Sequence, residues 1–456
     1  MEPVISNDLP NGYDIADVEF RRQRSQQQPE KIAENGENAL EKAPTAASAH
    51  TQSETYPEGG TAAWLVVTGG WFALFSGMGT LNTLATWQAY VLEHQLKGYS
   101  EGTVGWIFSV YTFLTFFCGI YIGPIFDKYG PRWLIIAGAV CLVASFVLLA
   151  FCKEYWHFML SFGVLSGLAT SLLLTPSIAS IGHWFKARRG FTTSIATSAG
   201  GLGGIIFPFM LTNLWDRIGY QWGTLVLALI AVVTSSIGVL LIKARLPPAP
   251  NATAQPDFRI FKQIPFLLTT LGIFTLEFSL FIPLAYISTF AMAKGFSTTF
   301  AYQLLPILNA GSVIGRLLPG YYSDIIGAFN TCILATVLSF IATICVWLPA
   351  GHTTAGIVIF AILFGLGSGI AIAIAPVCIS RMCKTQEYGR YYATAYMVVS
   401  FACLIGIPIA GNILQASNGS YIGLIITTGA VFLLSSALLI WAKLWQLGLS
   451  GWKDVY

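Results

Sequence analysis

The chain reads GPIFDKYG at residues 123–130 and GYYSDIIG at residues 320–327. Glycine, aspartate and glycine keep the same spacing in both stretches, and each stretch follows a long apolar run. Pro176 and Pro376 recur at nearly the same offset in later apolar runs. Repetition of this kind predicts two structural copies of one unit. The alternative is a chance similarity between glycine-rich loops.

The repeated stretches lie among about twelve apolar runs, each long enough to cross the ~30 Å hydrocarbon core of a bilayer. We expect membrane spans near residues 63–90, 104–124, 133–152, 157–181, 191–213, 222–242, 264–290, 299–321, 330–350, 354–376, 390–413 and 421–443. The predicted fold class is therefore an all-α polytopic membrane protein with two six-helix halves.

The composition agrees with this class. Of 456 residues, 55% are hydrophobic and 10% are charged, whereas soluble domains carry about 25% charged residues. Mean hydropathy is +0.67 and net charge only +3, so no nucleic-acid partner is indicated. The eight cysteines form no CxxC motif and no Cys/His ligand spacing. We therefore expect neither a disulfide framework, nor a metal site, nor a cofactor.

Polar segments mark the limits of the apolar bundle. The first 57 residues are rich in Gln, Glu, Ala and Ser and nearly free of aromatic residues, which predicts a disordered tail. A proline-rich linker divides the spans six and six. The predicted organisation is a tail at 1–57, a first half at 58–242, a linker at 243–262, a second half at 263–443 and a tail at 444–456.

Basic residues fall mainly on one side of the predicted membrane. That side holds Lys128, Arg132, Lys186, Arg188, Arg189, Lys243, Arg245, Arg259, Lys262, Arg381, Lys384 and Arg390. The other side holds only Lys97, Lys153, Arg217 and Lys294. Because cytoplasmic loops carry the excess of Lys and Arg, we expect the first side, both tails and the linker to be cytoplasmic. The plasma membrane is the expected location, and a vacuolar membrane remains an alternative.

Several motifs resemble the monocarboxylate transporter family. The stretch PEGG at residues 57–60, followed by Trp64, resembles the signature that opens this family. Four further stretches resemble it at residues 127–132, 182–204, 280–283 and 309–320, the last of them being closest to the fungal branch. The resemblance covers everything after the tail. It implies the major facilitator architecture, with substrate bound between the two halves near the membrane midplane.

The resemblance also implies transport of small organic anions, often coupled to protons. Arg316 matches the arginine that binds the substrate carboxylate in animal members of the family. Its guanidinium offers a planar fork suited to a carboxylate, while the alternative is an arginine that snorkels to the cytoplasmic surface. Asn82 stands where proton-coupled members have a lysine, and Ser312 where they have an acidic residue. The usual proton-handling pair is therefore missing.

Glu277 and Arg316 are the only full charges in the interior of the predicted spans, since Arg390 and Lys443 stand at span ends. A charge near the bilayer centre costs at least ~2.5–3.5 kcal/mol, so it usually faces a cavity or a partner. Glu277 lies about 13 residues into its span, hence near the midplane. Burial would favour its protonated form, so it is our candidate for proton coupling. The alternative is a permanently neutral glutamate bonded to a neighbouring helix. The two depths favour coupling to Arg316 through substrate or water.

Other polar side chains in the spans are candidate substrate contacts. They are Asn82, Tyr286, Asn309 and Tyr396. Hydrogen bonding to a ligand and hydrogen bonding between helices are both compatible with such residues.

The cytoplasmic loops contain candidate gating residues. They are Asp127, Arg132, Arg188, Arg189 and Asp324. In the major facilitator architecture such residues form a charge network between helices that steadies the outward-open state. The alternative is that the arginines only mark topology.

Together these features predict a secondary active transporter of a small organic, anionic molecule that works by alternating access. Export of a fungal secondary metabolite is the first interpretation, and uptake of a monocarboxylate or a vitamin such as riboflavin is the alternative. A non-transporting membrane sensor ranks lower. No span carries paired carboxylates or a Ser/His constellation, which argues against an enzyme. The expected partners are the substrate, the lipid bilayer and protons.

The basic-residue asymmetry predicts that the linker faces the cytoplasm. Cysteines placed at residues 243–262 should therefore resist an impermeant thiol reagent added to intact cells, whereas a cysteine at Lys153 should react. Labelling of the linker from outside would contradict both the orientation and the six-plus-six division.

Overall fold

The computed structural model describes residues 56–246 and 255–447, and within these ranges the secondary structure is helical. The first half contains α2 (Thr61–Leu81), α3 (Leu84–Glu93), α4 (Glu101–Phe117), α5 (Gly119–Tyr129), α6 (Arg132–Leu149), α7 (Tyr155–Phe158), η1 (Met159–Ser166), α8 (Gly167–Trp184) and α9 (Arg189–Leu241).

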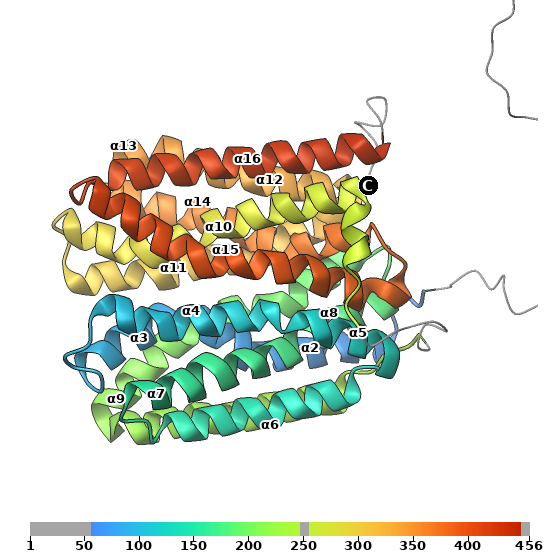
Figure 1. Ribbon diagram of the computed structural model, residues 1–456, viewed down its shortest axis with the longest axis horizontal. Coiled ribbons are helices and arrows are strands. Elements are labelled where there is room, and N and C mark those ends of the chain that lie inside the picture. Colours follow the sequence, from blue (N-terminus) through green and yellow to red (C-terminus); the bar gives the residue numbers. More distant parts are fainter. Residues whose placement is uncertain (1–55, 247–254, 448–456) are drawn as a thin grey trace, which may run out of the picture. The chain divides into compact units, whose positions relative to one another are not determined.

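The second half begins after the linker. The linker ends in η2 (Phe258–Lys262). The second half contains α10 (Ile264–Ala293), α11 (Thr298–Ile326), α12 (Ala328–Ile341), η3 (Ala342–Trp347), α13 (Leu348–Ala350), α14 (Thr354–Ser380), η4 (Thr385–Glu387), α15 (Tyr388–Ala416) and α16 (Tyr421–Leu447). Figure 1 shows α2–α9 gathered in one bundle beside α10–α16. One buried apolar cluster draws residues from both bundles, and a second lies within α10–α16 and its loops.

The described helices account for the predicted crossings. Ten segments are long and apolar enough to span a membrane. One of them, α9, runs for 53 residues and contains two arms. The less apolar α11 is a further long helix, so the total of about twelve crossings and the all-α fold class are confirmed.

A single glycine turns the chain between the two arms of α9. Gly219 has φ 83° and ψ 163°, a backbone conformation that glycine adopts without steric cost. Gly69 of α2 faces Leu241, and its neighbour Gly70 faces Ala196. Both arms therefore pass the same part of α2 in opposite directions. The sequence predicted a longer connection, at residues 214–221, because it showed the two apolar runs but not the tightness of the turn.

The first predicted span, residues 63–90, is wrong as a single helix. It is interrupted at Asn82 and Thr83. Asn82 Nδ2 donates to the carbonyl oxygen of Met78 (2.9 Å), and Thr83 Oγ1 donates to that of Thr80 (2.9 Å). The same two carbonyl oxygens also accept backbone N–H groups, from Asn82 (3.1 Å) and Thr83 (3.0 Å), so the side chains add a second donor to each and stabilise the break.

Several helices also continue beyond their predicted ends. As a result Asp127 and Asp324 lie within α5 and α11 rather than in connections, and Lys443, the last residue of its predicted span, lies inside α16. Lys443 is buried, and its Nζ donates to Asn330 Oδ1 at 2.8 Å. The apolar pattern does not reveal such extensions. It counts a charged residue as the end of a span, whether or not the folded chain supplies that residue with a buried partner.

Glycine allows α11 and α14 to approach backbone to backbone. A Cβ atom at Gly365 would meet the carbonyl oxygen of Leu308, and one at Gly369 would meet that of Ser312. In the other direction, a Cβ atom at Gly311 of α11 would lie 2.7 Å from the carbonyl oxygen of Ile362 in α14. In a bilayer helices associate through close packing rather than through the hydrophobic effect, so these glycines fix how α11, the helix of Arg316, sits in its half.

Candidate functional site

A small cavity lies between the two halves. Its volume is about 30 Å³. It is lined by Met78, Leu81, Asn82, Phe116, Leu174, Ile178, Thr197, Glu277, Leu280, Phe281, Leu284, Arg316, Ile372, Pro376, Tyr392 and Tyr396. A space of this size holds one or two water molecules, so an organic substrate enters only when the lining moves. This form of the protein is therefore occluded at the centre.

Arg316 is the cation of this cavity. Its side chain is 1% exposed, and its Nη1 donates to the backbone carbonyl of Thr197 on α9, in the opposite half. Its Nε has no hydrogen-bond partner in the described ranges. The guanidinium is thus buried at the interface between the halves and does not snorkel to a surface. One of its donors is left to a group that enters the cavity.

Glu277, on α10, is the acid of the same cavity. It is 3% exposed, and the charge of Arg316 acts on its carboxyl group. Tyr392 and Tyr396 of α15 lie close enough to interact electrostatically with it. The structure therefore brings the two isolated charges of the sequence to one small space.

Two of the other predicted contacts reach the cavity and two do not. Asn82 and Tyr396 line it. Tyr286 instead donates to the Ile407 carbonyl at 3.2 Å, and Asn309 Nδ2 donates to the Gly204 carbonyl at 3.1 Å. Asn309 and Tyr286 are thus bonded to neighbouring helices, which is the alternative that the sequence left open for such residues.

A glycine patch on α9 makes room for the polar side chains. Asn82 Nδ2 donates to the Gly200 carbonyl at 3.1 Å. A Cβ at Gly200 would lie 3.3 Å from both Arg316 Nη1 and Asn82 Nδ2. The glycines at residues 200–204 therefore serve helix packing and also let a cation approach the backbone of α9.

Sequence reasoning missed the aromatic lining. Phe116, Phe281 and Tyr392 all contribute rings to the cavity. The ring centroids of Phe116 and Tyr396 are 5.4 Å apart, and those of Tyr392 and Tyr396 are 4.5 Å apart. Phe281 belongs to the quoted 280–283 motif, but nothing in one sequence marks which face of a wholly apolar helix looks inward.

The first motif aspartate binds the opposite half. Asp127, near the end of α5, accepts hydrogen bonds from the backbone N–H groups of Gly389 (3.0 Å) and Arg390 (2.8 Å). Both donors lie in the first turn of α15, whose N-cap residue Glu387 makes no side-chain cap. The carboxylate thus satisfies helix donors that would otherwise lack partners and faces the positive end of the helix dipole.

The second motif aspartate makes the equivalent contact in the reverse direction. Asp324, near the end of α11, accepts from the backbone N–H groups of Gly190 (2.8 Å) and Phe191 (2.9 Å). These lie in the first turn of α9, which also lacks a cap from its own N-cap residue. We refer to the Asp127–α15 and Asp324–α9 contacts as the two latches.

Of the three predicted gating arginines, only Arg189 joins the two halves. Arg189 donates from Nη2 to Gly182 O (2.7 Å) and to Thr385 Oγ1 (3.2 Å), so it joins the halves beside the latches. The arginines whose charges act on the aspartates are Arg390 and Arg381. The predicted charge network therefore contains residues that sequence reasoning passed over.

The other two predicted gating arginines stand outside the latches. The side chain of Arg188 is exposed. Arg132 lines a separate pocket at the end of the first half.

A strap at residues 56–58 reaches across the same end of the protein. The Glu58 carboxylate accepts from the backbone N–H groups of Lys186 (2.7 Å), Ala187 (2.7 Å) and Arg188 (3.1 Å). The Tyr56 hydroxyl lies 2.6 Å from Thr385 Oγ1 in the second half. Tyr56 had been predicted to belong to the disordered tail, of which residues 1–55 lie outside the described ranges.

Comparison with known proteins gives the family. The Major Facilitator Superfamily profile matches residues 67–407. The chain is 34% identical to MFS-type transporter 1 of Ophiocordyceps sp. (88% of this chain, 89% of the relative) and 34% identical to the fujikurins efflux protein of Gibberella fujikuroi (90% and 88%). It is 32% identical to a riboflavin transporter of Saccharomyces cerevisiae (79% and 74%).

A solved structure shares the fold. The human organic anion transporter TETRAN superposes with a TM-score of 0.67 at 14% identity, covering 84% of this chain and 100% of its own. The profile match spans most of the chain, and the helices, the repeated motif and the site between the halves agree with it. This protein is a multi-pass membrane transporter and belongs to the major facilitator superfamily.

Proposed function

We propose that the chain carries a small, largely apolar organic anion across the membrane by alternating access, as a monocarboxylate-transporter-like secondary transporter. The observation that carries the proposal is the buried guanidinium of Arg316, whose Nε is unpartnered in the described ranges. A buried cation is costly until it is paired, so an entering anion improves its environment. A carboxylate suits the planar fork of arginine.

The rest of the lining supports an amphipathic substrate. Apart from Arg316 and Glu277 the cavity is surrounded mainly by aliphatic and aromatic side chains. A ligand with one acidic group and an apolar or aromatic body therefore fits the chemistry better than a polyanion or a sugar.

Export of a secondary metabolite is the first assignment that we propose. It is supported by the likeness to the fujikurins efflux protein over most of both chains. Uptake of a riboflavin-like compound is the second candidate, supported by the likeness to a riboflavin transporter and by the aromatic rings of the lining. In both cases we place the protein in the plasma membrane with its termini in the cytoplasm, on the basic-residue asymmetry.

The proposed cycle uses Arg316 as a contact that changes partner. In the occluded form Arg316 binds the Thr197 carbonyl across the interface. A substrate carboxylate offers a charged acceptor in place of that neutral carbonyl, so binding would free α11 from α9. We call the end of the bundle where the excess of Lys and Arg lies the basic end. The two latches would hold this end closed until the halves rock apart. Glu277, which shares the cavity, is the group that we propose to exchange a proton with each cycle.

Arg316→Lys is the test of anion recognition. The lysine keeps the charge but loses the planar fork, so we expect an affinity loss of roughly tenfold or more. Thermal stabilisation of the purified full chain by a panel of aromatic and aliphatic monocarboxylic acids, their methyl esters and riboflavin measures this. The exposed Arg259→Lys is the matched control. Equal binding of acid and ester would contradict the anionic substrate, and stabilisation by riboflavin alone would favour the second candidate.

Glu277→Gln is the test of proton coupling. The amide mimics the protonated carboxyl, so concentrative, pH-driven transport should disappear while exchange of substrate for substrate persists. Transport in proteoliposomes with and without a pH gradient distinguishes the two, and Glu93→Gln at the exposed end of α3 is the control. A Glu277→Gln protein that still follows the gradient would leave the glutamate with a structural role.

The paired substitution Asp127→Asn with Asp324→Asn tests the latches. An anionic partner at a helix N-terminus contributes roughly 0.3–2 kcal/mol, so losing both charges should populate forms open at the basic end. Electron paramagnetic resonance distances between spin labels at positions 128 and 384, in a background free of native cysteines, should broaden toward longer values. Asp216→Asn, exposed and remote, should leave them unchanged. An unaltered distribution in the double variant would exclude a gating role.

A further inference from the structure

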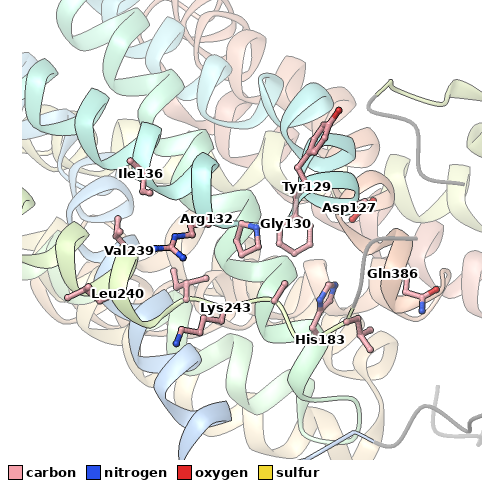
Figure 2. A pocket seen from close by; sticks show the side chains of 15 residues that line it. Asp127, Tyr129, Gly130, Arg132, Ile136, His183, Val239, Leu240, Lys243 and Gln386 are labelled. Atoms are coloured by element: carbon pink, nitrogen blue, oxygen red, sulfur yellow. The ribbon is translucent and has the colours of Figure 1, made fainter. Parts of the chain in front are cut away.

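A second and larger pocket lies at the basic end of the first half. Its volume is about 570 Å³, and Figure 2 shows the side chains around it. It forms where α5 meets α6, where α8 ends and where the second arm of α9 ends. It is separate from the central cavity, since the two share no lining residue.

One part of this pocket is cationic. Arg132 is the first residue of α6, and Lys243 follows the end of α9. Both side chains line the pocket and are exposed. Neither side chain makes a hydrogen bond or an ion pair within the part of the chain that the structure describes; the bond that Lys243 accepts from Trp184 Nε1 is to its backbone carbonyl. Two free cations beside the N-terminus of an 18-residue helix create a positive potential there.

His183 supplies an independent sign of a ligand. Only 5% of His183 is exposed, and it lines the same pocket. Neither ring nitrogen has a partner of normal hydrogen-bond geometry within residues 56–246 and 255–447, although the backbone of Thr385 lies near enough to act on the ring. Buried polar groups are nearly always paired, and the Thr385 backbone can serve only one of the two ring nitrogens, so the other is left to a ligand that enters the pocket. The main chain of His183 is fixed by Arg245, whose Nε donates to its carbonyl at 2.9 Å.

The outer part of the pocket is apolar and faces the bilayer. Ile136, Val239 and Leu240 line it. Leu240 is 71% exposed, and Trp133, which follows Arg132 in the chain, is 75% exposed; both lie on helices that cross the membrane. Large apolar side chains on the outside of such helices contact acyl chains, and a tryptophan near a helix end marks the headgroup level. The ligand is therefore an amphiphile.

We infer that this pocket binds an anionic phospholipid. Its phosphate would lie between Arg132 and Lys243 and accept a hydrogen bond from His183, and its chains would lie along Ile136, Val239 and Leu240. Asp127 also lines the pocket, but its carboxylate is bonded to two backbone N–H groups of α15. The two cations leave the pocket net positive.

The bound lipid would touch both halves. Gln386, which lines the pocket, comes from η4 of the second half, next to the latch that Asp127 makes with α15. Binding would therefore favour the closed form at this end. On the orientation proposed above, this end faces the cytoplasmic leaflet, where anionic lipids gather.

The test is a lipid titration of the purified full chain in detergent, read by thermal unfolding through tryptophan fluorescence. Dioctanoyl phosphatidylglycerol should raise the unfolding midpoint at roughly tenfold lower concentration than dioctanoyl phosphatidylcholine. Arg132→Gln with Lys243→Gln should remove most of that preference. The matched control, Arg259→Gln with Lys262→Gln, removes two exposed cations from the linker and should keep the preference.

Three results would overturn the assignment. They are equal responses to the two lipids, equal loss in the control variant, and a shift by inorganic phosphate at the same concentration as the anionic lipid. The last would identify a site for a free anion instead of a lipid. The assay needs no substrate and no membrane orientation, so failure of the proposed transport function would leave its result readable.

Discussion

Capping of a helix in one half by a carboxylate of the other half is the interaction that joins the two halves at the end where the basic residues gather. The first turns of α9 and α15 carry backbone N–H groups with no cap from their own N-cap residues. By contrast α4, α11 and α14 are capped by Ser100, Ser297 and Thr353 from their own loops. α15 and α9 instead receive Asp127 and Asp324 from across the interface, and the halves cannot part without exposing these donors to water.

The latches also explain several glycines. A Cβ at Gly389 would meet Asp127 Oδ1, and one at Gly190 would meet Asp324 Oδ1. Gly123 likewise faces the Gly389 carbonyl, so the motif glycine and the helix-start glycine are needed together. Glycine at these positions serves close approach of two backbones, with no positive φ involved.

The Asp324–α9 latch and the Arg316 contact at the centre involve the same two helices, α9 and α11. α9 receives Asp324 at its start and offers the Thr197 carbonyl to Arg316 further along, while α11 supplies both partners. A shift of α11 against α9 therefore changes both contacts. If a substrate displaces the Thr197 carbonyl from Arg316 as we propose, its binding would reach the Asp324–α9 latch through this one packed pair of helices, with no separate relay.

The fold class, the repeat and the two charges that share the cavity could be predicted from the sequence. Each rests on a feature that can be read along the linear chain: the length of apolar runs, the spacing of a motif, or an isolated charge. The sequence could not predict that Asn82 ends a helix or that Gly219 alone makes a turn, because both depend on backbone geometry. Nor could it separate Tyr396, which faces the cavity, from Tyr286, which bonds to a helix, since both are tyrosines in apolar runs. The partners of the aspartates are backbone groups, which carry no sequence signature.

The reciprocal form of the latches has an evolutionary meaning. Each half contributes one carboxylate and one uncapped helix start, and each receives the complement from the other. An interface in which both partners present the same donor and acceptor is isologous, the type formed by twofold homodimers. A six-helix ancestor with one such motif would already have been self-complementary. Duplication and fusion of its gene would then have preserved a working dimer contact inside a single chain.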